Sequence, residues 1–297
     1  MNLRHLGFFV ALAREGHFGR AAQAVHVTQP SLSAAIRQLE QELDVPLVVR
    51  TRQRFEGLTP EGREVLVWAQ RMLAESASLQ QYLDELKGSL KGHLSIGVIP
   101  TAEPIIARLT HALQQRYPGI TVTLISSTSR EIDRALADHE LDAGISYSEG
   151  ADTVNLRAVP LYLERYFVAG VAKLLPARRA SLSWREAAAL PLCLLSRDMQ
   201  NRRLLDNHFD EAGVVPAVVA ESNTLIGVLS HIHTGAWCGI LPNAMLGLLR
   251  GVKVLPLADP EVTHRIALLV PARKPTPPLT QALLTVASGL KLDLSKP

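Results

Sequence analysis

Apolar residues recur at helical spacing in three segments of the first 58 residues, and short polar stretches separate these segments. The first segment is marked by Leu3, Leu6, Phe9 and Val10, the second by Phe18, Ala21, Ala22 and Val25, and the third by Leu32, Ala35, Ile36, Leu39 and Leu43. Gly16 stands where a helix commonly ends, and Thr28 is a suitable N-cap for the third segment. The pattern predicts three short helices that pack together.

Two β-prone runs follow the third helix, at residues 47–49 and 55–58. Between them stands "RTRQR", in which Arg50, Arg52 and Arg54 place three positive charges within five residues. The arrangement predicts a two-stranded hairpin with a basic tip.

A long helix is expected to begin at Thr59, an N-cap residue, with Pro60 in the first turn. Its apolar stripe advances by four and three residues in turn: Val65, Ala69, Met72, Ser76, Leu79, Leu83, Leu86 and Leu90. Such a heptad is typical of a coiled-coil seam. The alternative is a helix that lies on its own domain, but the preceding chain is too small to bury so long a stripe. We therefore expect residues 59–91 to form a linker helix that dimerises.

The glycine-containing stretch "KGSLKGH", residues 87–93, is the expected domain boundary. Beyond it, strand-like runs alternate with helical segments: strands in "HLSIGVIP", "ITVTLIS", "LDAGISY", "AVVAES" and "HTGAWCGILPNA", and helices over residues 105–117, 131–138 and 278–292. This alternation predicts an α/β domain with crossover connections and a largely parallel sheet.

Composition sets limits on function. The chain has 297 residues, of which 47% are hydrophobic and 20% charged, as is usual for a globular protein of two or three domains. Neither a secretory signal nor a membrane-spanning stretch of about 20 apolar residues is visible, and two cysteines make no disulfide framework, so a cytoplasmic location is expected. The net charge of +3 is compatible with nucleic acid but does not establish it.

Motifs of enzymes are absent from the sequence: it has no phosphate-binding loop, no dinucleotide glycine fingerprint and no nucleophile elbow. His231 and His233 could form a metal-binding pair on a strand, but they fall in a helix-like run, where this spacing points them apart. Cys193 and Cys238 lie in apolar runs typical of buried, inert cysteines. We expect no catalytic residue, no metal ligand and no cofactor.

The second and third predicted helices, joined by "HVTQP", have the arrangement of a helix-turn-helix, whose second helix enters the major groove of DNA with its N-terminal end. Gln29 can contact adenine or a phosphate, and Arg37 can reach a base or a phosphate one turn later. The hairpin would act as a wing on the phosphates. The predicted DNA-binding residues are Gln29, Pro30, Ser31, Ser33, Arg37, Arg50, Arg52 and Arg54. The alternative is that the polar residues only cap the helix and the arginines are solvated.

Residues 8–66 resemble the N-terminal domain of the LysR-type transcriptional regulators. The matching positions are Phe18, Ala21, Ala22, Gln29, Pro30, Ser31, Ser33, Ile36, Leu39, Glu40, Leu47, Arg50, Leu58, Thr59 and Gly62. "GVIPTAEP", "LDAGI" and "TGAWCGILP" occupy the places of three segments of that family's effector domain. The resemblance implies a winged helix-turn-helix at 1–58, a linker helix at 59–91, and a two-lobed, periplasmic-binding-protein-like effector domain at 92–297. Lobe I would span about 92–161 and 267–297, and lobe II about 162–266.

Three residues depart from the family pattern. His17 stands where serine is common, Asp44 where glycine is common and Val48 where phenylalanine is common. Loss of a serine N-cap at His17 puts one expected phosphate contact in doubt. Asp44 and Val48 lie near the wing, where they are expected to affect packing more than recognition.

Hydroxyl-rich loops follow several predicted strands, which is where a two-lobed α/β fold binds its ligand. The candidate effector-binding residues are Thr101, Ser126, Ser127, Ser129, Ser196, Arg197, Ser222 and Thr224. Exposed amides at helix N-termini favour anions, and Arg197 could pair with a carboxylate. Glu103 and Glu221 would suit an amine-bearing group instead, and each hydroxyl could equally be a helix cap. Of these alternatives we favour a small anionic metabolite.

The predicted function is sequence-specific control of transcription by a homo-oligomer that binds a pseudo-palindromic double-stranded DNA site. Its expected assembly is a homodimer through residues 59–91 that pairs into a homotetramer, and RNA polymerase is a possible further partner. An exported solute-binding protein is an alternative, but it leaves the first 90 residues without a role. An enzyme on the α/β domain is another, and no nucleophile–base pair supports it.

Overall fold

The computed structural model describes residues 2–51, 54–148, 155–290 and 292. These residues form two compact units: the first comprises residues up to 89 together with 137–140, and the second comprises residues 90–136 and those from 141 onward. The chain passes from the first unit to the second within the glycine-containing stretch at residues 87–93. Each unit has a hydrophobic core of its own.

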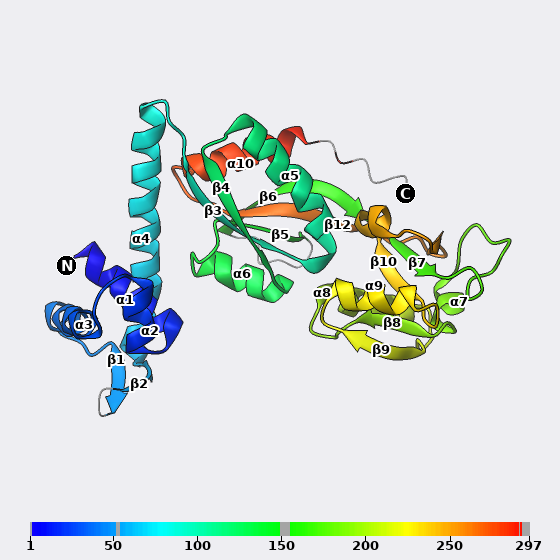
Figure 1. The fold of residues 1–297 in the computed structure, drawn as a ribbon, viewed down its shortest axis with the longest axis horizontal. Coiled ribbons are helices and arrows are strands. Elements are labelled where there is room, and N and C mark those ends of the chain that lie inside the picture. The colour runs from blue at the N-terminus through cyan, green and yellow to red at the C-terminus, as the bar shows by residue number, and fades with distance from the viewer. Residues whose placement is uncertain (1, 52–53, 149–154, 291, 293–297) are drawn as a thin grey trace. The chain divides into compact units, whose positions relative to one another are not determined.

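The first unit contains three helices and a hairpin (Figure 1). In order, these are α1 (Leu3–Glu15), α2 (Phe18–Ala24), α3 (Gln29–Leu43), β1 (Val48–Thr51) and β2 (Arg54–Leu58). Gly16 ends α1 in the left-handed conformation, with φ of 59°, and the side chain of Thr28 caps α3 by accepting from the backbone N–H of Ser31. The predicted winged helix-turn-helix is thereby confirmed.

The long helix α4 (Pro60–Leu86) starts at the expected cap, where Thr59 Oγ1 accepts from the Gly62 N–H at 2.8 Å. Gly62 has to be glycine because a Cβ there would stand 2.0 Å from the Leu47 carbonyl oxygen. This contact holds the beginning of α4 against the start of the wing.

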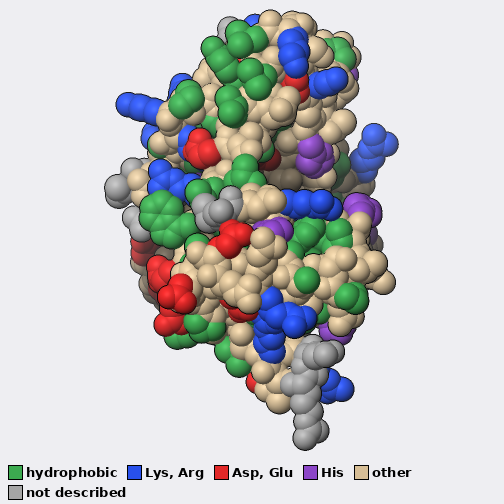
Figure 2. Space-filling model, turned by 90° about the vertical axis from the view of Figure 1, so that its left-hand side faces the viewer, with side chains coloured by type: hydrophobic (Ala, Val, Ile, Leu, Met, Phe, Trp, Pro, Cys, Tyr) green, Lys and Arg blue, Asp and Glu red, His purple; other side chains and the backbone are tan. Residues whose placement is uncertain are grey.

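The two halves of α4 have different surroundings. In the first half, Ala69 is buried and Val65 packs against the core of the first unit. This half therefore lies on its own domain, which was the alternative to a coiled coil. In the second half, Leu79, Leu83 and Leu86 are 61%, 41% and 67% exposed. Figure 2 shows hydrophobic side chains gathered at the end of the molecule where α4 finishes. The predicted continuation of the helix to Leu90 is wrong: α4 ends at Leu86, before Gly88, whose φ is +72°.

Lobe I of the second unit is built on a five-stranded sheet with strand order β4-β3-β5-β12-β6. Its strands are β3 (Gly92–Val98), β4 (Ile120–Ser126), β5 (Ala143–Tyr147), β6 (Leu156–Glu164) and β12 (His264–Pro271). Helices α5 (Glu103–Arg116) and α10 (Pro278–Gly289) cover one face, and α6 (Ser129–Ala137) covers the other (Figure 1). The short helix η1 (Pro100–Ala102) links β3 to α5.

The expectation of a largely parallel sheet holds for only part of lobe I. β3 runs parallel to β4 and β5, but β12 is antiparallel to both β5 and β6. The chain enters the sheet a second time through β12 after passing through lobe II, and the alternation of strands and helices in the sequence did not indicate the direction of that return.

Lobe II contains β7 (Tyr166–Gly170), α7 (Trp184–Ala188), β8 (Leu192–Leu195), α8 (Gln200–Glu211), β9 (Val218–Ser222), α9 (Leu225–His233), β10 (Gly239–Pro242), η3 (Asn243–Leu248) and β11 (Lys253–Pro256). β7 lies between β10 and β11 and is antiparallel to both, whereas β8 and β9 are parallel. A bridge between Leu192 and Cys238 joins the two groups of strands. This arrangement places the N-terminus of α8 next to the end of β8.

Two chain segments connect the lobes. Arg165 alone separates β6 of lobe I from β7 of lobe II, and the return segment enters lobe I at His264. The strands of lobe I therefore reach Glu164 and resume at residue 264, so the expected limits of 161 and 267 fall inside β6 and β12. Within the ranges described, no helix has the length and apolar character needed to cross a membrane.

Candidate DNA-binding surface and effector cleft

The N-terminal end of α3 forms one wall of a concave surface. Gln29, Pro30 and Arg37 are exposed and Ser33 is half-buried, and all four line a hollow of ≈ 370 Å³. Phe18 of α2 and Arg50 of β1 complete its lining. The structure thus brings together five of the eight predicted DNA-binding residues around one hollow beside the helix-turn-helix.

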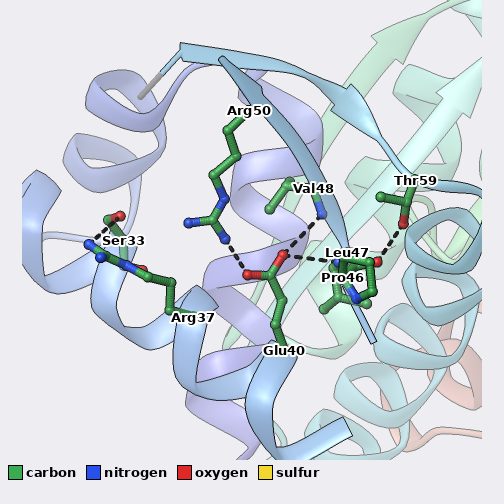
Figure 3. Close-up of polar contacts among 8 residues, drawn as sticks. All are labelled: Ser33, Arg37, Glu40, Pro46, Leu47, Val48, Arg50 and Thr59. Atoms are coloured by element: carbon green, nitrogen blue, oxygen red, sulfur yellow. Dashed lines mark hydrogen bonds and ion pairs between the residues drawn. The ribbon is translucent and has the colours of Figure 1, made fainter. Parts of the chain in front are cut away.

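Two of the predicted hydroxyls take part in contacts within α3. Ser31 is exposed at the helix start, with its Oγ 2.8 Å from Thr28 Oγ1. Ser33 Oγ accepts from Arg37 Nη2 at 3.3 Å (Figure 3). The Arg37 guanidinium therefore lies along the helix toward its N-terminal end, where a DNA phosphate or base would stand in a helix-turn-helix complex.

Arg50 is held by the protein itself. Its guanidinium donates to Glu40 Oε2 (Figure 3). Its Cζ lies 5.8 Å from the centre of the Phe18 ring. Glu40 Oε1 also accepts from the backbone N–H groups of Leu47 and Val48, at 3.0 and 3.2 Å. Glu40 thereby connects α3 to the first strand of the wing, and the guanidinium of Arg50 neutralises the negative charge of the Glu40 carboxylate.

The remaining wing arginines differ in what the structure describes. Arg54 is exposed at the beginning of β2, and Arg52 lies outside the described residues. Figure 2 shows Lys and Arg side chains near the wing and also elsewhere on the same face.

His17 supplies the N-cap of α2. Its Nδ1 accepts from the Gly19 N–H at 3.0 Å and from the Arg20 N–H at 3.4 Å. An accepting Nδ1 places the proton of the neutral ring on Nε2. Histidine therefore replaces the capping oxygen of serine, and the beginning of α2 keeps its cap.

Sequence reasoning missed two exposed residues of α3. Ala34 and Gln38 follow Pro30 at intervals of four residues and lie on the same side of the helix. The spacing alone could have identified them, but attention to polar residues near the helix start left out an alanine and a later glutamine.

A cavity lies between the lobes of the second unit. Lobe I contributes Ile99, Pro100, Thr101, Thr128, Ser129 and Tyr147, and lobe II contributes Leu195, Met199, Gln200 and Asn201. The hydroxyl oxygens of Thr101 and Ser129 are buried. Ser129 Oγ has no hydrogen-bond partner among the described residues, whereas the Thr101 hydroxyl faces Glu164 and Tyr147 and acts to lower the pKa of both. The first turns of α6 and α8 face this space from opposite lobes. Its free volume is ≈ 10 Å³, about that of a single water molecule.

Only two of the eight predicted effector-binding residues, Thr101 and Ser129, line this cavity. Ser222 and Thr224 serve α9 instead: Thr224 Oγ1 caps it by accepting from the Gly227 N–H, and Ser222 Oγ donates to the Thr224 carbonyl oxygen. Ser126, Ser127, Ser196 and Arg197 are not among the lining residues. Sequence reasoning missed Tyr147 and Asn201, which a strand end and a helix start place at the cleft.

Glu221 and Glu103 are not part of the lining either. Glu221 Oε1 accepts from the buried Arg202 at 2.8 Å and lies 3.9 Å from Arg197 Nε. Its negative charge is therefore balanced by two arginines of lobe II.

A buried carboxyl group lies behind the cleft. Glu164 Oε1 accepts from Tyr147 Oη at 2.8 Å and is 3.4 Å from Asn201 Nδ2 of the other lobe. The hydroxyl groups of Tyr166 and Thr101 also face this carboxyl group and act to lower its pKa. Burial raises the pKa of Glu164 from 4.5 to about 7, although the bonds from Tyr147 and Asn201 act in the opposite direction. Glu164 is a group at the junction of the lobes that can change charge near neutral pH.

Two arginines of opposite lobes affect each other electrostatically, although neither lines the cavity. Arg130 is exposed in the first turn of α6 in lobe I, and Arg203 is half-buried in α8 of lobe II. Burial and, next, the positive charge of Arg130 lower the pKa of Arg203. The two like charges make the region between α6 and α8 more positive, and Asp198 acts on Arg203 in the opposite direction.

Two protein families match the chain, one over the helix-turn-helix and the other over the effector domain. Residues 3–63 match the bacterial regulatory helix-turn-helix protein family of the lysR type, and residues 87–289 match the LysR substrate binding domain. The chain belongs to the LysR family of transcriptional regulators. It is a DNA-binding regulator with a substrate-binding domain and not an enzyme.

Curated relatives of this LysR-type regulator match along almost its whole length. The HTH-type transcriptional regulator CzcR of Bacillus cereus is 29% identical over 276 residues, which cover 92% of each chain. The nitrogen assimilation regulatory protein nac of Escherichia coli is 26% identical and covers 95% of this chain and 93% of its own. The hydrogen peroxide-inducible genes activator of Haemophilus influenzae is 27% identical and covers 98% and 96%.

Solved structures give the same picture of the LysR-type fold. A full-length OxyR variant from Pseudomonas aeruginosa superposes with a TM-score of 0.78 at 26% identity, over 97% of this chain and 94% of that one. Full-length CbnR in complex with its target DNA superposes with a TM-score of 0.68 at 22% identity, over 97% and 99%. The second likeness shows the fold alone.

The sequence of this LysR-type regulator offers two cysteines and a pair of neighbouring histidines as candidates for thiol or metal chemistry. The part of the chain that the structure describes contains no group of His, Cys, Asp and Glu side chains suited to a metal ion. Cys193 and Cys238 are both buried, and burial raises the pKa of both thiols, that of Cys238 to about 11. His231 and His233 each bond to a backbone carbonyl oxygen through Nδ1, in separate contacts on α9.

Proposed function

We propose that this LysR-type regulator controls transcription in response to a small anionic metabolite that binds between the two lobes of its effector domain. The observation that carries the proposal is the buried, unpartnered hydroxyl of Ser129, with the hydroxyl of Thr101 beside it, in the interlobe cavity of the described chain. A buried hydroxyl without a partner is costly, and a ligand oxygen would remove that cost.

Three further features support an anion. Residues of the first turns of α6 and α8 line the cavity, and N-terminal helix ends favour negative charge. Arg130 and Arg203 add cations from opposite lobes. The neighbouring carboxylate of Glu221 is neutralised by Arg202. Carboxylates and inorganic oxyanions fit these donors better than an amine.

Effector binding requires a movement, because the space between the lining side chains is only ≈ 10 Å³. The lobes or the side chains between them must move apart to admit a ligand and then close upon it. Closure on an anion would select one lobe arrangement. A change of lobe arrangement in a symmetric oligomer then alters the spacing and bending of the bound DNA half-sites.

The DNA contacts in this proposal come from α3 and the wing. Gln29, with Pro30, Ser31, Ser33 and Arg37, would address the major groove, and Arg50, Arg52 and Arg54 the phosphates or the minor groove. The exposed leucines of the second half of α4 support a homodimer through that helix, because a free chain would leave this stripe in water. Pairing of dimers into a tetramer and contact with RNA polymerase extend the proposal.

The effector is tested by a thermal-shift screen of the full-length protein against small carboxylates, amino acids, sulfate and phosphate. A bound ligand raises the unfolding temperature with its occupancy. We expect a carboxylate or oxyanion to do so in the wild type and in Ser222→Ala, whose hydroxyl serves α9, and not in Ser129→Ala. Stabilisation by amines alone, or an equal response in Ser129→Ala, would refute the assignment.

A further inference from the structure

Helix α8 is attached to both lobes through two different faces. Leu205 and Phe209 lie in the core of lobe II. Asn201, Leu204 and His208, at positions i, i+3 and i+7, share another face that is directed at lobe I. Leu204 packs against the core of lobe I, and Asn201 Nδ2 lies 3.4 Å from both Tyr147 Oη and Glu164 Oε1. A relative movement of the lobes therefore has to break the contacts of this face of α8 with lobe I, or to slide the face along lobe I.

The third contact of this face is a pair of histidines. His208 Nε2 of α8 lies 3.0 Å from His264 Nε2 at the start of β12, with 5.3 Å between the ring centres. His208 Nδ1 is 3.0 Å from Glu211 Oε2 and donates to that carboxylate. A bond between two ring nitrogens needs one donor and one acceptor. The pair can therefore carry one positive charge with the bond intact, but a second charge sets two N–H groups against each other.

The elements packed around the pair contribute neutral rings and charges of both signs. The groups around it include Trp184 of α7 at 5.1 Å, Tyr147 of β5 at 6.2 Å, Tyr166 of β7 at 5.9 Å, Glu211 of α8, and Glu164 of β6, which stands opposite His264 in the strand register. Arg185 of α7 and Asp259 line the same surface hollow as His208, one with a positive and the other with a negative charge. The side chain of Glu211 is 70% exposed, so water screens its charge.

The second carboxyl group offers no compensation in acid. Burial raises the pKa of Glu164 to about 7, so this group becomes neutral as the pH falls below neutrality. Histidine changes its charge between about pH 5 and pH 8. The nearest buried carboxyl group therefore supplies no counter-charge to an imidazolium in acid.

We propose that the contact between His208 and His264 is a latch that holds the lobes of this regulator together and that is released when both rings are protonated. Its regulatory meaning rests on the proposed function, because a cavity of ≈ 10 Å³ admits an effector only when the lobes part. The latch itself depends only on contacts within the effector domain. Mild acid would thus open the cleft.

The test measures the distance between the lobes in the full-length protein without any effector. Spin labels are placed on cysteines introduced at Gln281 of α10 and at Val215, which is 88% exposed after α8. The native cysteines are both buried and stay unlabelled. Pulsed electron paramagnetic resonance compares pH 8 with pH 5.5, in labelled protein diluted with unlabelled protein, and circular dichroism verifies that the chain remains folded.

We expect longer distances at pH 5.5 than at pH 8 in the otherwise native chain. His208→Gln should abolish this shift, because an uncharged amide can pair with His264 in either protonation state. His231→Gln is the matched control: His231 lies 5.1 Å from Trp237, as His208 does from Trp184, but it bonds to Gly227 within its own helix. An unchanged distance in the native chain, a full shift in His208→Gln, or loss of the shift in His231→Gln would overturn the latch. None of these results depends on the nature of the effector.

Discussion

Replacing Glu164 by glutamine should change how the stability of the effector domain depends on pH. The carboxyl group has its pKa raised from 4.5 to about 7 by burial. A folded state with the higher pKa binds more protons than the unfolded state, so the stability contributed by this group is complete in acid and lost as the pH rises through 7. At about 1.4 kcal/mol for each pH unit, the loss amounts to about 3 kcal/mol between pH 4 and pH 8.

Glutamine keeps an oxygen that can accept from Tyr147 and Asn201 but cannot ionise. Relative to the wild type, Glu164→Gln should therefore gain about 3 kcal/mol in its free energy of unfolding as the pH rises from 4 to 8. Urea denaturation followed by circular dichroism at several pH values measures this difference. Glu103→Gln, an exposed position in lobe I, serves as the control and should follow the wild type. Parallel curves for wild type and Glu164→Gln would refute the reasoning.

Three further changes test other parts of the structure. Arg50→Ala should cost the DNA-binding unit roughly 1.5–3 kcal/mol in urea denaturation, because a part-buried carboxylate loses its partner, whereas Arg54→Ala should leave its stability unchanged. An equal cost for both would contradict the role of Arg50 in the wing. Leu79→Ser combined with Leu83→Ser should shift the protein toward the monomer in sedimentation, and Val215→Ser should not. Hydrogen peroxide should leave DNA binding in a gel-shift assay unchanged, because both thiols are buried and have raised pKa values; a reversible loss would show that a thiol is accessible.

Local features were predictable because they depend on neighbouring residues. Thr28 caps α3 and Thr59 caps α4 through bonds to N–H groups three residues later, and Gly16 ends α1 as its position indicates. The apolar stripe of α3 is buried as its spacing predicts. These signals, with the dense resemblance of the first sixty residues, were sufficient for the winged helix-turn-helix.

Contacts between distant segments were not predictable in the same way. Ser222 and Ser129 both follow strands, but one hydroxyl binds within its own loop and the other faces the cleft. The difference depends on how α6 and α9 sit on their sheets, which no local pattern records. Arg50 looked like a free wing charge because its partner, Glu40, is a helix residue ten positions earlier. The histidine pair joins residues that are 56 positions apart.

The central claim is that the N-terminal end of α3 reads DNA sequence. Selection of binding sites from random duplex DNA, with the wild type, Gln29→Ala and Arg54→Ala in parallel, tests it most directly. The wild type should enrich a site with two related halves, Gln29→Ala should lose the preference at one position in each half, and Arg54→Ala should keep the same motif at lower affinity with a weaker dependence on salt. The same motif at the same strength in the wild type and Gln29→Ala, or no enriched site in the wild type, would contradict the claim.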